Sequence, residues 1–383
     1  MIDWVLAERF AVLLAGRGPT APGGTGGGPG APAVERGVRA AQRLPEMAVD
    51  AERRVVGYTG LVPSRPLPPP EAIDRREWVR ANVASMRRLL EPVLARADER
   101  LRSSNGSSPG RRSRAGASLA VSVVVTTEVA VVLGFLAQRV LGQYELVLLE
   151  EPDDQPPRLL FVLPNLAGAV TSLEAPEDEF LTWVTLHEVT HGVQFAGVPW
   201  LQGYIAGLAG ELMRSAELRI DAPRTRLPSR AQLARSLRAV RDGDVVGIFA
   251  SPGERSTLDR VQAVMAVVEG HAEHVMDAVA PDLLPSLPRL RAALDRRRRT
   301  RSGLARLLGR LLGLELKLRQ YEQGKFFCDA IVAAAGREAL VRVFASPEAL
   351  PTLDEIGEPA RWIARMGLAP ALGEASRSTR SHD

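Results

Sequence analysis

Cysteine, lysine and histidine are scarce in this chain of 383 residues. Cys328 is the single cysteine, which excludes an intrachain disulfide and any zinc site built from cysteine ligands. Its apolar neighbours, among them Phe327 and Ile331, predict a buried thiol. A buried, unpaired thiol is typical of a reducing compartment, so we expect a cytoplasmic protein. Because there are only five histidines, any regular histidine pattern is informative.

The sequence also lacks a clean long hydrophobic run. The nearest approach to a transmembrane span lies at residues 119–137, but Glu128 stands at its centre, and a central charge is costly in lipid. Asp3 and Glu8 interrupt the N-terminal apolar stretch, and no small-residue cleavage site follows it, so no signal peptide is predicted. We therefore expect a buried helix over 119–137, or a strand that leads into a helix, and no membrane partner.

The charge pattern does not point to a polyanionic partner. The formal net charge is +4, and nearly all basic residues are arginine. The densest basic run covers residues 296–299, with Arg301 and Arg306 beyond it. No aromatic residues interleave with this run, which favours a solvated helix face or connector over a surface for nucleic acid. We expect no nucleic-acid partner.

Residues 187–191 read His-Glu-Val-Thr-His, the pattern with which zincin metallopeptidases bind zinc and activate water. On a helix, here predicted over 177–196, this spacing puts His187 and His191 on one face, where two imidazoles can bind one Zn²⁺. Glu188 lies about 100° round the helix, so it can reach a metal-bound water without binding the metal. The alternative is a buried amphipathic helix whose two histidines only pack or form hydrogen bonds.

A catalytic zinc site needs a third protein ligand, and residues 267–274 are the strongest source of one. Glu269 and Glu273 are four apart and share a helix face. His271 lies about 200° round the helix from Glu269, on the side of His274. Ligand chemistry and helical phase favour Glu269 as the ligand, with Glu273 orienting an imidazole. The alternative is His271 as the ligand, with His274 orienting a metal ligand or stabilising the transition state.

These residues predict a mechanism of amide hydrolysis. Glu188 would take the proton from zinc-bound water and pass it to the leaving amine. An oxyanion stabiliser should lie nearby, and Tyr321 or one of the histidines at 271 and 274 is a candidate. A tyrosine that caps a helix contact is the commoner case. Gly270, next to the ligand, would permit close approach of another helix.

The chain as a whole is predicted to be mainly α-helical, with a small β element just before the motif helix. Residues 1–33 form an amphipathic helix and a flexible Gly/Pro segment, and 34–370 form one domain that contains a low-complexity loop at 103–118. Residues 371–383 form a disordered tail. Within the domain we expect an extended piece at 55–60, a hairpin with strands at 144–150 and 159–163, and helices at 71–102, 119–141, 200–222, 228–241 and 256–280, the last capped by Ser256.

Five blocks resemble a known family. They are LGFLAQRVLGQYEL (133–146), FVLPNL (161–166), WVTLHEVTHGVQFAGVPWL (183–201), LDRVQAVMAVVEGHAEHVMD (258–277) and LGLELKLRQYEQG (312–324). In this order they are similar to the zincin-like metallopeptidase family of actinobacteria and relatives, whose members are often labelled coenzyme F(420) biosynthesis-associated proteins. The resemblance covers about residues 34–365.

The resemblance implies a mainly helical zincin-like domain, a zinc ion and a hydrolase activity on a peptide or protein substrate. With Glu269 as third ligand, the site would be of the gluzincin type. Two alternatives stay open: a catalytically silent zincin-like protein that binds a partner, and a hydrolase associated with deazaflavin coenzyme metabolism. The coenzyme label implies no substrate, because it is a name of genomic association and not of a demonstrated reaction. The chain also has no Gly-rich phosphate loop that would indicate a deazaflavin site.

Overall fold

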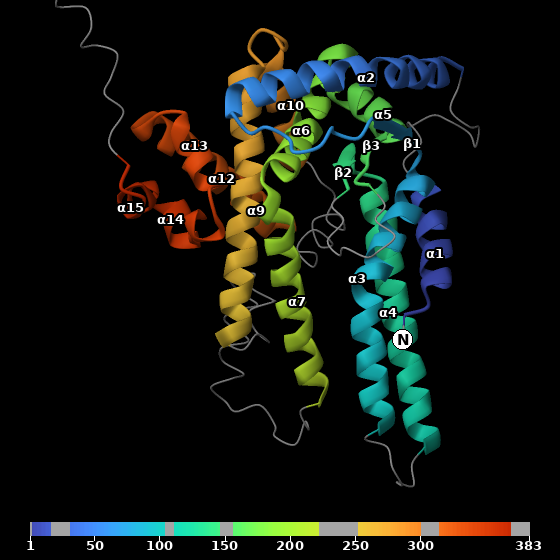
Figure 1. Cartoon of the computed structure of the whole chain (residues 1–383). Coiled ribbons are helices and arrows are strands. Elements are labelled where there is room, and N and C mark those ends of the chain that lie inside the picture. Colours follow the sequence, from blue (N-terminus) through green and yellow to red (C-terminus); the bar gives the residue numbers. More distant parts are fainter. Residues whose placement is uncertain are drawn as a thin grey trace, which may run out of the picture.

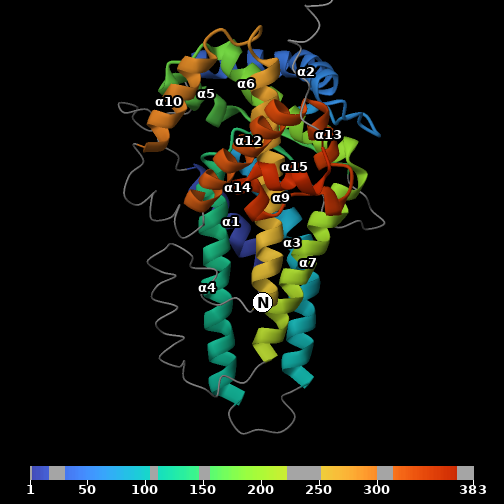
Figure 2. The ribbon, with the colours of Figure 1, turned by 90° about the vertical axis from the view of Figure 1, so that its left-hand side faces the viewer.

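The computed structural model describes residues 2–16, 31–103, 111–145, 156–221, 252–299 and 314–368. It is mainly helical with a small three-stranded sheet, as predicted (Figures 1 and 2). The elements up to the sheet are α1 (Trp4–Gly16), α2 (Ala31–Thr59), β1 (Pro70–Ile73), α3 (Arg75–Ser103), α4 (Arg111–Ala137), β2 (Gly142–Tyr144) and β3 (Leu159–Val162). Those that follow are α5 (Leu163–Leu173), α6 (Glu177–Gly197), α7 (Pro199–Asp221), α9 (Pro252–Val279), α10 (Leu287–Arg299), α12 (Leu314–Ala335), α13 (Glu338–Val343), the 3-10 helix η1 (Pro347–Ala349), α14 (Leu353–Gly357) and α15 (Pro359–Arg365).

The sheet divides the hydrophobic core into two parts. Strand β3 lies between β1, with which it pairs in parallel, and β2, with which it pairs antiparallel. Because successive strand residues point to opposite faces, Leu159 and Phe161 enter a larger core, whereas Leu160 and Val162 enter a smaller one. A strand buried on both faces is a continuous apolar run in the sequence, and that run allowed β3 to be predicted at 159–163. The partner strand was expected at 144–150, whereas β2 ends at Tyr144 and residues 146–150 lie outside the described residues.

The smaller core lies among α1, α3 and α4, and small residues let α1 and α4 approach closely (Figure 1). Ala7, Ala11 and Ala15 of α1 are fully buried. A Cβ on Gly134 of α4 would lie only 2.5 Å from Cβ of Leu14. Helix α4 contains the apolar stretch predicted as a buried helix, but only one face of it is buried: Ala130, Leu133 and Ala137 pack inward, whereas Val123, Val124 and Val131 are exposed. In the ranges that the structure describes, no helix combines the length and the apolarity that crossing a membrane requires.

The larger core is built around α6 and α9, with α2 across one end and α12 packed along α9 (Figures 1 and 2). Two glycines allow the backbones of α9 and α12 to touch. A Cβ on Gly270 would lie 2.1 Å from the backbone carbon of Gly324, and a Cβ on Gly324 would lie 1.9 Å from the carbonyl oxygen of Ala266. The close helix approach predicted at Gly270 is thus confirmed. Cys328 of α12 is buried, also as predicted.

Some local predictions are wrong. Helix α2 runs unbroken to Thr59, where an extended piece was expected, because its buried residues Leu44, Ala48, Ala51 and Val55 recur at helical spacing. Strand β1 was not predicted in its Pro-rich surroundings. The predicted loop and cap also differ: α4 already begins at Arg111, inside the loop expected over 103–118, and α9 begins at Pro252, four residues before Ser256.

Some expected segments cannot be compared with the structure. The helix expected at 228–241, most of the Gly/Pro segment and the tail at 371–383 lie outside the described residues.

Candidate metal centre

The His-Glu-Val-Thr-His motif lies on α6, a helix buried along most of its length. Glu177, Asp178 and Glu179 occupy its first turn, where carboxylates suit the positive end of the helix dipole. The helix ends at Gly197, and Val198 leaves the helical conformation before the next helix begins. Burial on several sides holds the helix in place, so the side chains of the motif project from a rigid support.

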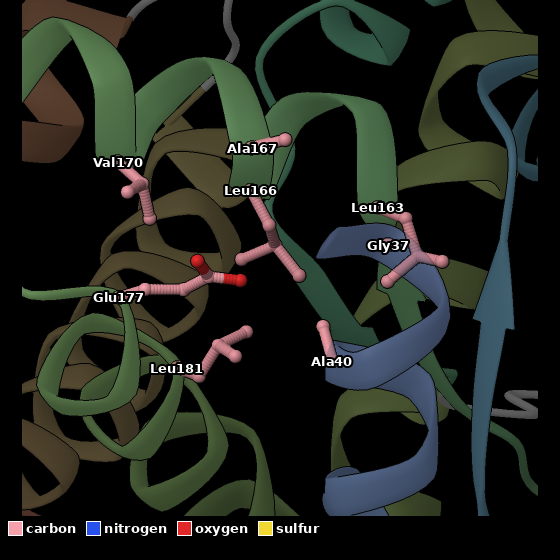
Figure 3. Close-up of a pocket in the computed structure, with 8 residues that line it drawn as sticks. All are labelled: Gly37, Ala40, Leu163, Leu166, Ala167, Val170, Glu177 and Leu181. Atoms are coloured by element: carbon pink, nitrogen blue, oxygen red, sulfur yellow. The ribbon is translucent and has the colours of Figure 1, made fainter. Parts of the chain in front are cut away.

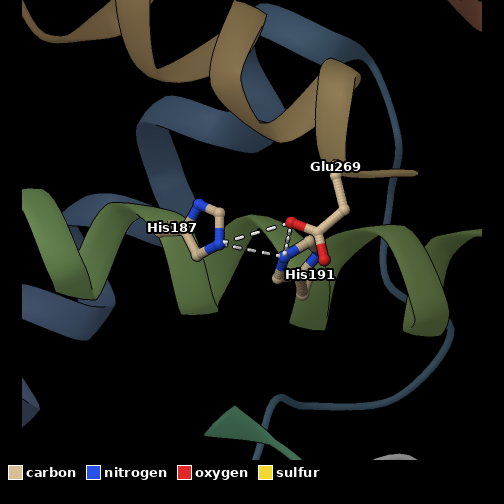
Figure 4. A group of neighbouring side chains, drawn as sticks. All are labelled: His187, His191 and Glu269. Atoms are coloured by element: carbon tan, nitrogen blue, oxygen red, sulfur yellow. Dashed lines mark hydrogen bonds and ion pairs between the residues drawn. The ribbon is translucent and has the colours of Figure 1, made fainter. Parts of the chain in front are cut away.

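His187 and His191 of α6 meet Glu269 of α9 (Figure 4). The two Nε2 atoms are 3.3 Å apart. Oε2 of Glu269 lies 3.7 Å from Nε2 of His187 and 3.6 Å from Nε2 of His191. A tetrahedral zinc ion with bonds of about 2.0–2.1 Å holds its ligand atoms roughly 3.4 Å apart. The three atoms therefore stand close to the spacing of one face of a zinc tetrahedron.

The charges around this cluster favour a cation. Burial lowers the pKa of His191, but the carboxylates of Glu269 and Glu188 outweigh it and raise that pKa to about 9. Burial also raises the pKa of Glu188 to about 7, a rise that His191 opposes and Glu269 reinforces. Two carboxylates beside two imidazoles thus attract positive charge. The donor set of two histidines and one carboxylate fits zinc, which binds imidazole nitrogen and carboxylate oxygen readily.

Strand β2 holds Glu188 in place. The glutamate is 7% exposed, and its Oε2 accepts a hydrogen bond of 3.1 Å from the backbone N–H of Tyr144. A Cβ on Gly142 would lie 2.7 Å from Cγ of Glu188, so glycine is needed to leave room for that side chain. Both residues were missed in the sequence. No local pattern there indicates that the main chain of this strand faces the motif.

Gln194 orients His191 and was also missed. Its Oε1 lies 2.8 Å from Nδ1 of His191, and its Nε2 donates a hydrogen bond of 2.8 Å to the carbonyl oxygen of Val268. The same Nε2 lies 2.9 Å from Nδ1 of His271. Gln194 is three residues after His191, and this i, i+3 spacing on a predicted helix is the signal that could have found it.

His271 and Glu273, two other predicted residues of α9, have partners of their own. His271 is 1% exposed, meets Gln194, and packs edge-on against Phe344 with ring centroids 5.0 Å apart. Burial, with smaller contributions from the neighbouring histidines, lowers the pKa of His271 to about 3. Glu273 accepts a hydrogen bond of 3.2 Å from Arg291 of α10. The partner at Nδ1 of His191 is Gln194.

His274 belongs to a network that joins α2, α9 and α12. Its Nε2 lies 2.8 Å from the hydroxyl of Tyr58, and its Nδ1 lies 2.6 Å from Oδ1 of Asp329. Lys325 donates a hydrogen bond of 2.5 Å to the other oxygen of Asp329. With both ring nitrogens engaged, His274 has none to offer a metal ion. The side chain of Tyr321 lies outside the described residues.

A pocket at the first turns of α6 is lined almost entirely by apolar residues (Figure 3). Leu181 is six residues before His187, about 9 Å along the helix. Glu177 is the one ionisable group among the residues that line the pocket, so the convergent polar groups of a ligand site are lacking there. The lining residues are Gly37, Ala40, Leu163, Leu166, Ala167, Val170, Glu177 and Leu181.

A helix with His-Glu-x-x-His, whose two histidines meet a carboxylate, matches the motif and ligand types of zincin metallopeptidases. The chain belongs to the zincin-like metallopeptidase family, whose model matches residues 2–363. It is 30% identical to a protein of Chloroflexus aurantiacus whose crystal structure bears the description "putative hydrolase with a novel fold". That match has a TM-score of 0.66 and covers 96% of this chain and 99% of the other. No curated protein matches the chain. At the level of the family, the chain is a hydrolase of the metallopeptidase class.

Proposed function

We propose that this protein hydrolyses a peptide or amide bond with a zinc-activated water. The convergence of His187, His191 and Glu269 supports the proposal most directly, since three donor atoms from two rigid helices stand at the spacing that one ion requires. Two histidines and a glutamate are a common ligand set of catalytic zinc. When bound, the zinc would polarise the scissile carbonyl and lower the pKa of the attacking water.

Glu188 is the general base in this proposal. Its Oε2 accepts the N–H of Tyr144, which fixes the carboxylate and leaves Oε1 to take the proton of the attacking water. The same oxygen then gives the proton to the leaving amine. Gln194 keeps the imidazole of His191 in place during these steps through the hydrogen bond to its Nδ1.

The test measures bound zinc and peptide hydrolysis for the same purified proteins. The variants are Glu188→Gln and Glu269→Gln. The matched control is Asp259→Asn, which changes an exposed acid on α9, the helix of Glu269. We expect Glu188→Gln to keep its zinc and to lose hydrolysis by a factor of roughly 10² to 10⁴, the usual contribution of a general base. Glu269→Gln should lose most of the zinc, and Asp259→Asn should match the wild type.

The outcomes separate the alternatives. A wild type that binds no added zinc, or a Glu188→Gln variant as active as the wild type, would overturn the proposal. A zinc-loaded wild type that cleaves nothing in a broad peptide library would favour the catalytically silent binding protein. The substrate set should include amide conjugates of a deazaflavin coenzyme, because cleavage of these alone would favour the coenzyme-linked alternative.

A further inference from the structure

The side-chain amide of Gln194 can point in one direction only. Three groups surround it: Nδ1 of His191, Nδ1 of His271 and the carbonyl oxygen of Val268. A backbone carbonyl accepts hydrogen bonds and never donates them, so the amide group that faces Val268 must be the NH₂. The oxygen of the amide therefore faces His191. Donor and acceptor chemistry alone therefore fixes the orientation of this amide.

This orientation determines where the proton lies on His191. Because Oε1 of Gln194 can only accept, Nδ1 of His191 must carry a hydrogen. In the neutral ring the lone pair is then on Nε2, the atom 3.3 Å from Nε2 of His187 and 3.6 Å from the carboxylate of Glu269. Without the glutamine, the neutral ring could hold its proton on Nε2, where it would block the metal.

His271 completes the arrangement on the other side. The NH₂ of Gln194 has two hydrogens, and the carbonyl of Val268 takes one of them. The second hydrogen points to Nδ1 of His271, which accepts it, so the proton of this neutral ring lies on Nε2. Phe344 packs edge-on against the ring and fixes its plane. His271 is therefore a second anchor for the amide.

The amide of Gln194 also links α6, which carries the two histidines, to α9, which carries Glu269. Val268 directly precedes Glu269 on α9, and Gln194 is one turn beyond His191 on α6. The hydrogen bond from Gln194 to Val268 therefore joins the two helices beside their ligands. It holds the carboxylate and the imidazoles at a fixed separation.

We propose that Gln194 and His271 are positioning residues of the metal centre: His271 and Val268 orient the amide of Gln194, and the amide holds His191 in the tautomer that presents Nε2 to the metal. This inference rests on the proposed function, because it assumes that His191 is a ligand. It predicts that the hydrogen-bond acceptor at position 194, and not only its bulk, sets the affinity for zinc.

The experiment measures zinc affinity of the full chain by competition with a chromophoric chelator. Gln194→Met keeps the volume and removes every hydrogen bond, whereas Gln194→Glu keeps an acceptor for His191 and loses the donor for Val268. We expect a 10- to 100-fold loss of affinity for Gln194→Met, the usual range for a lost orienting partner, and a smaller loss for Gln194→Glu. His271→Phe, which keeps the aromatic contact and removes the acceptor, should also lose less than Gln194→Met.

Thr190→Val is the matched control. The hydroxyl of Thr190 is buried next to His191 on α6, but it donates its hydrogen bond to the carbonyl oxygen of Leu186 within the helix. Its zinc affinity should equal that of the wild type. Melting temperatures in excess chelator check that each variant folds, and the visible spectrum of the cobalt-substituted protein reports ligand geometry without any substrate.

Three results would contradict the inference. If Gln194→Met binds zinc as the wild type does, the amide does not position His191. If Gln194→Glu loses as much affinity as Gln194→Met, the acceptor is not what matters. If the wild type binds no zinc, this inference and the proposed function fail together, whereas a zinc-binding wild type with unaffected variants leaves the proposed function standing.

Discussion

His191 of α6 and His274 of α9 are two buried histidines with different surroundings: the first faces the candidate metal centre and the second faces a hydrogen-bond network. They are buried to a similar degree, at 9% and 7% exposure, and each has a polar partner at Nδ1, Gln194 and Asp329 respectively. They differ at Nε2. That of His191 lies beside a second imidazole nitrogen and a carboxylate oxygen, whereas that of His274 meets the hydroxyl of Tyr58. The partner of the second nitrogen, and not burial, separates a ligand candidate from a packing histidine.

The largest expected effect concerns the side of α9 on which Gly270 and His274 lie. Gly270→Ala would force a methyl group to within 2.1 Å of the backbone of Gly324, which neither helix can avoid without moving. We expect a loss of about 3 kcal/mol or more in the free energy of unfolding, at the upper end of overpacking effects. Chemical denaturation measures it.

Gly57→Ala is the control for this prediction. It also changes a helical glycine, but nothing lies within 4 Å of the added Cβ. Alanine should therefore gain up to about 1 kcal/mol there, because its helix propensity is higher. Equal stability of the two variants would show that the α9–α12 contact is looser than the structure indicates.

A smaller effect is expected for His274→Phe. The variant removes the hydrogen bonds of His274 to Tyr58 and to Asp329, which keeps Lys325, and should cost about 2 kcal/mol, the order of one or two lost buried hydrogen bonds. Zinc affinity should stay within a factor of about 3 of the wild type, since His274 is not in the cluster. Chelator competition and denaturation on the same sample give both numbers. If His274→Phe lost zinc affinity without losing stability, His274 would belong to the metal centre and not to the packing network.

The smallest effect is expected for Asp329→Asn, and it should depend on pH. Burial raises the pKa of Asp329, but hydrogen bonds from Lys325 and His274 outweigh it and hold the pKa below its ordinary value of 3.8. A carboxyl with a lowered pKa stabilises the fold above its unfolded pKa and loses that contribution as pH falls through the folded one. The difference in stability between wild type and variant should be below about 1 kcal/mol at pH 7, because the group is partly exposed.

This difference should persist to about pH 4 and vanish below it, as followed by melting temperatures across the acid range. The stabilisation by zinc should decline from a much higher pH, as pH falls through about 9, because His191 must be unprotonated to bind the metal and its pKa in the metal-free site is raised to about 9. A variant effect that is the same at pH 7 and pH 3 would show that Asp329 does not act through its charge.

The sequence predicted the elements that carry chemistry and missed the contacts that orient them. His187, Glu188 and His191 form a local pattern, and Glu269 follows from helical phase, so all four could be named before the fold. Gln194 has the right spacing but no local sign that Val268 and His271 would meet it. Gly142 acts through main-chain geometry, which composition does not encode. The extension of α2 to Thr59 was misjudged because β-branched residues near its end favoured a strand locally, whereas packing on the larger core favoured a helix.

The contact between β2 and Glu188 has a consequence for how this site tolerates mutation. The donor to Glu188 is a peptide N–H, which every residue except proline would supply at position 144. The hydrogen bond itself would survive a change of side chain at 144, but Tyr144 is also a buried core residue whose ring stacks on Phe195, so a small or polar residue there would cost stability. A side chain at 142 would instead have to displace Glu188. Random mutagenesis scored by hydrolysis should therefore accept buried aromatic residues such as phenylalanine at 144, whereas any side chain at 142 should lower hydrolysis because it must displace the glutamate.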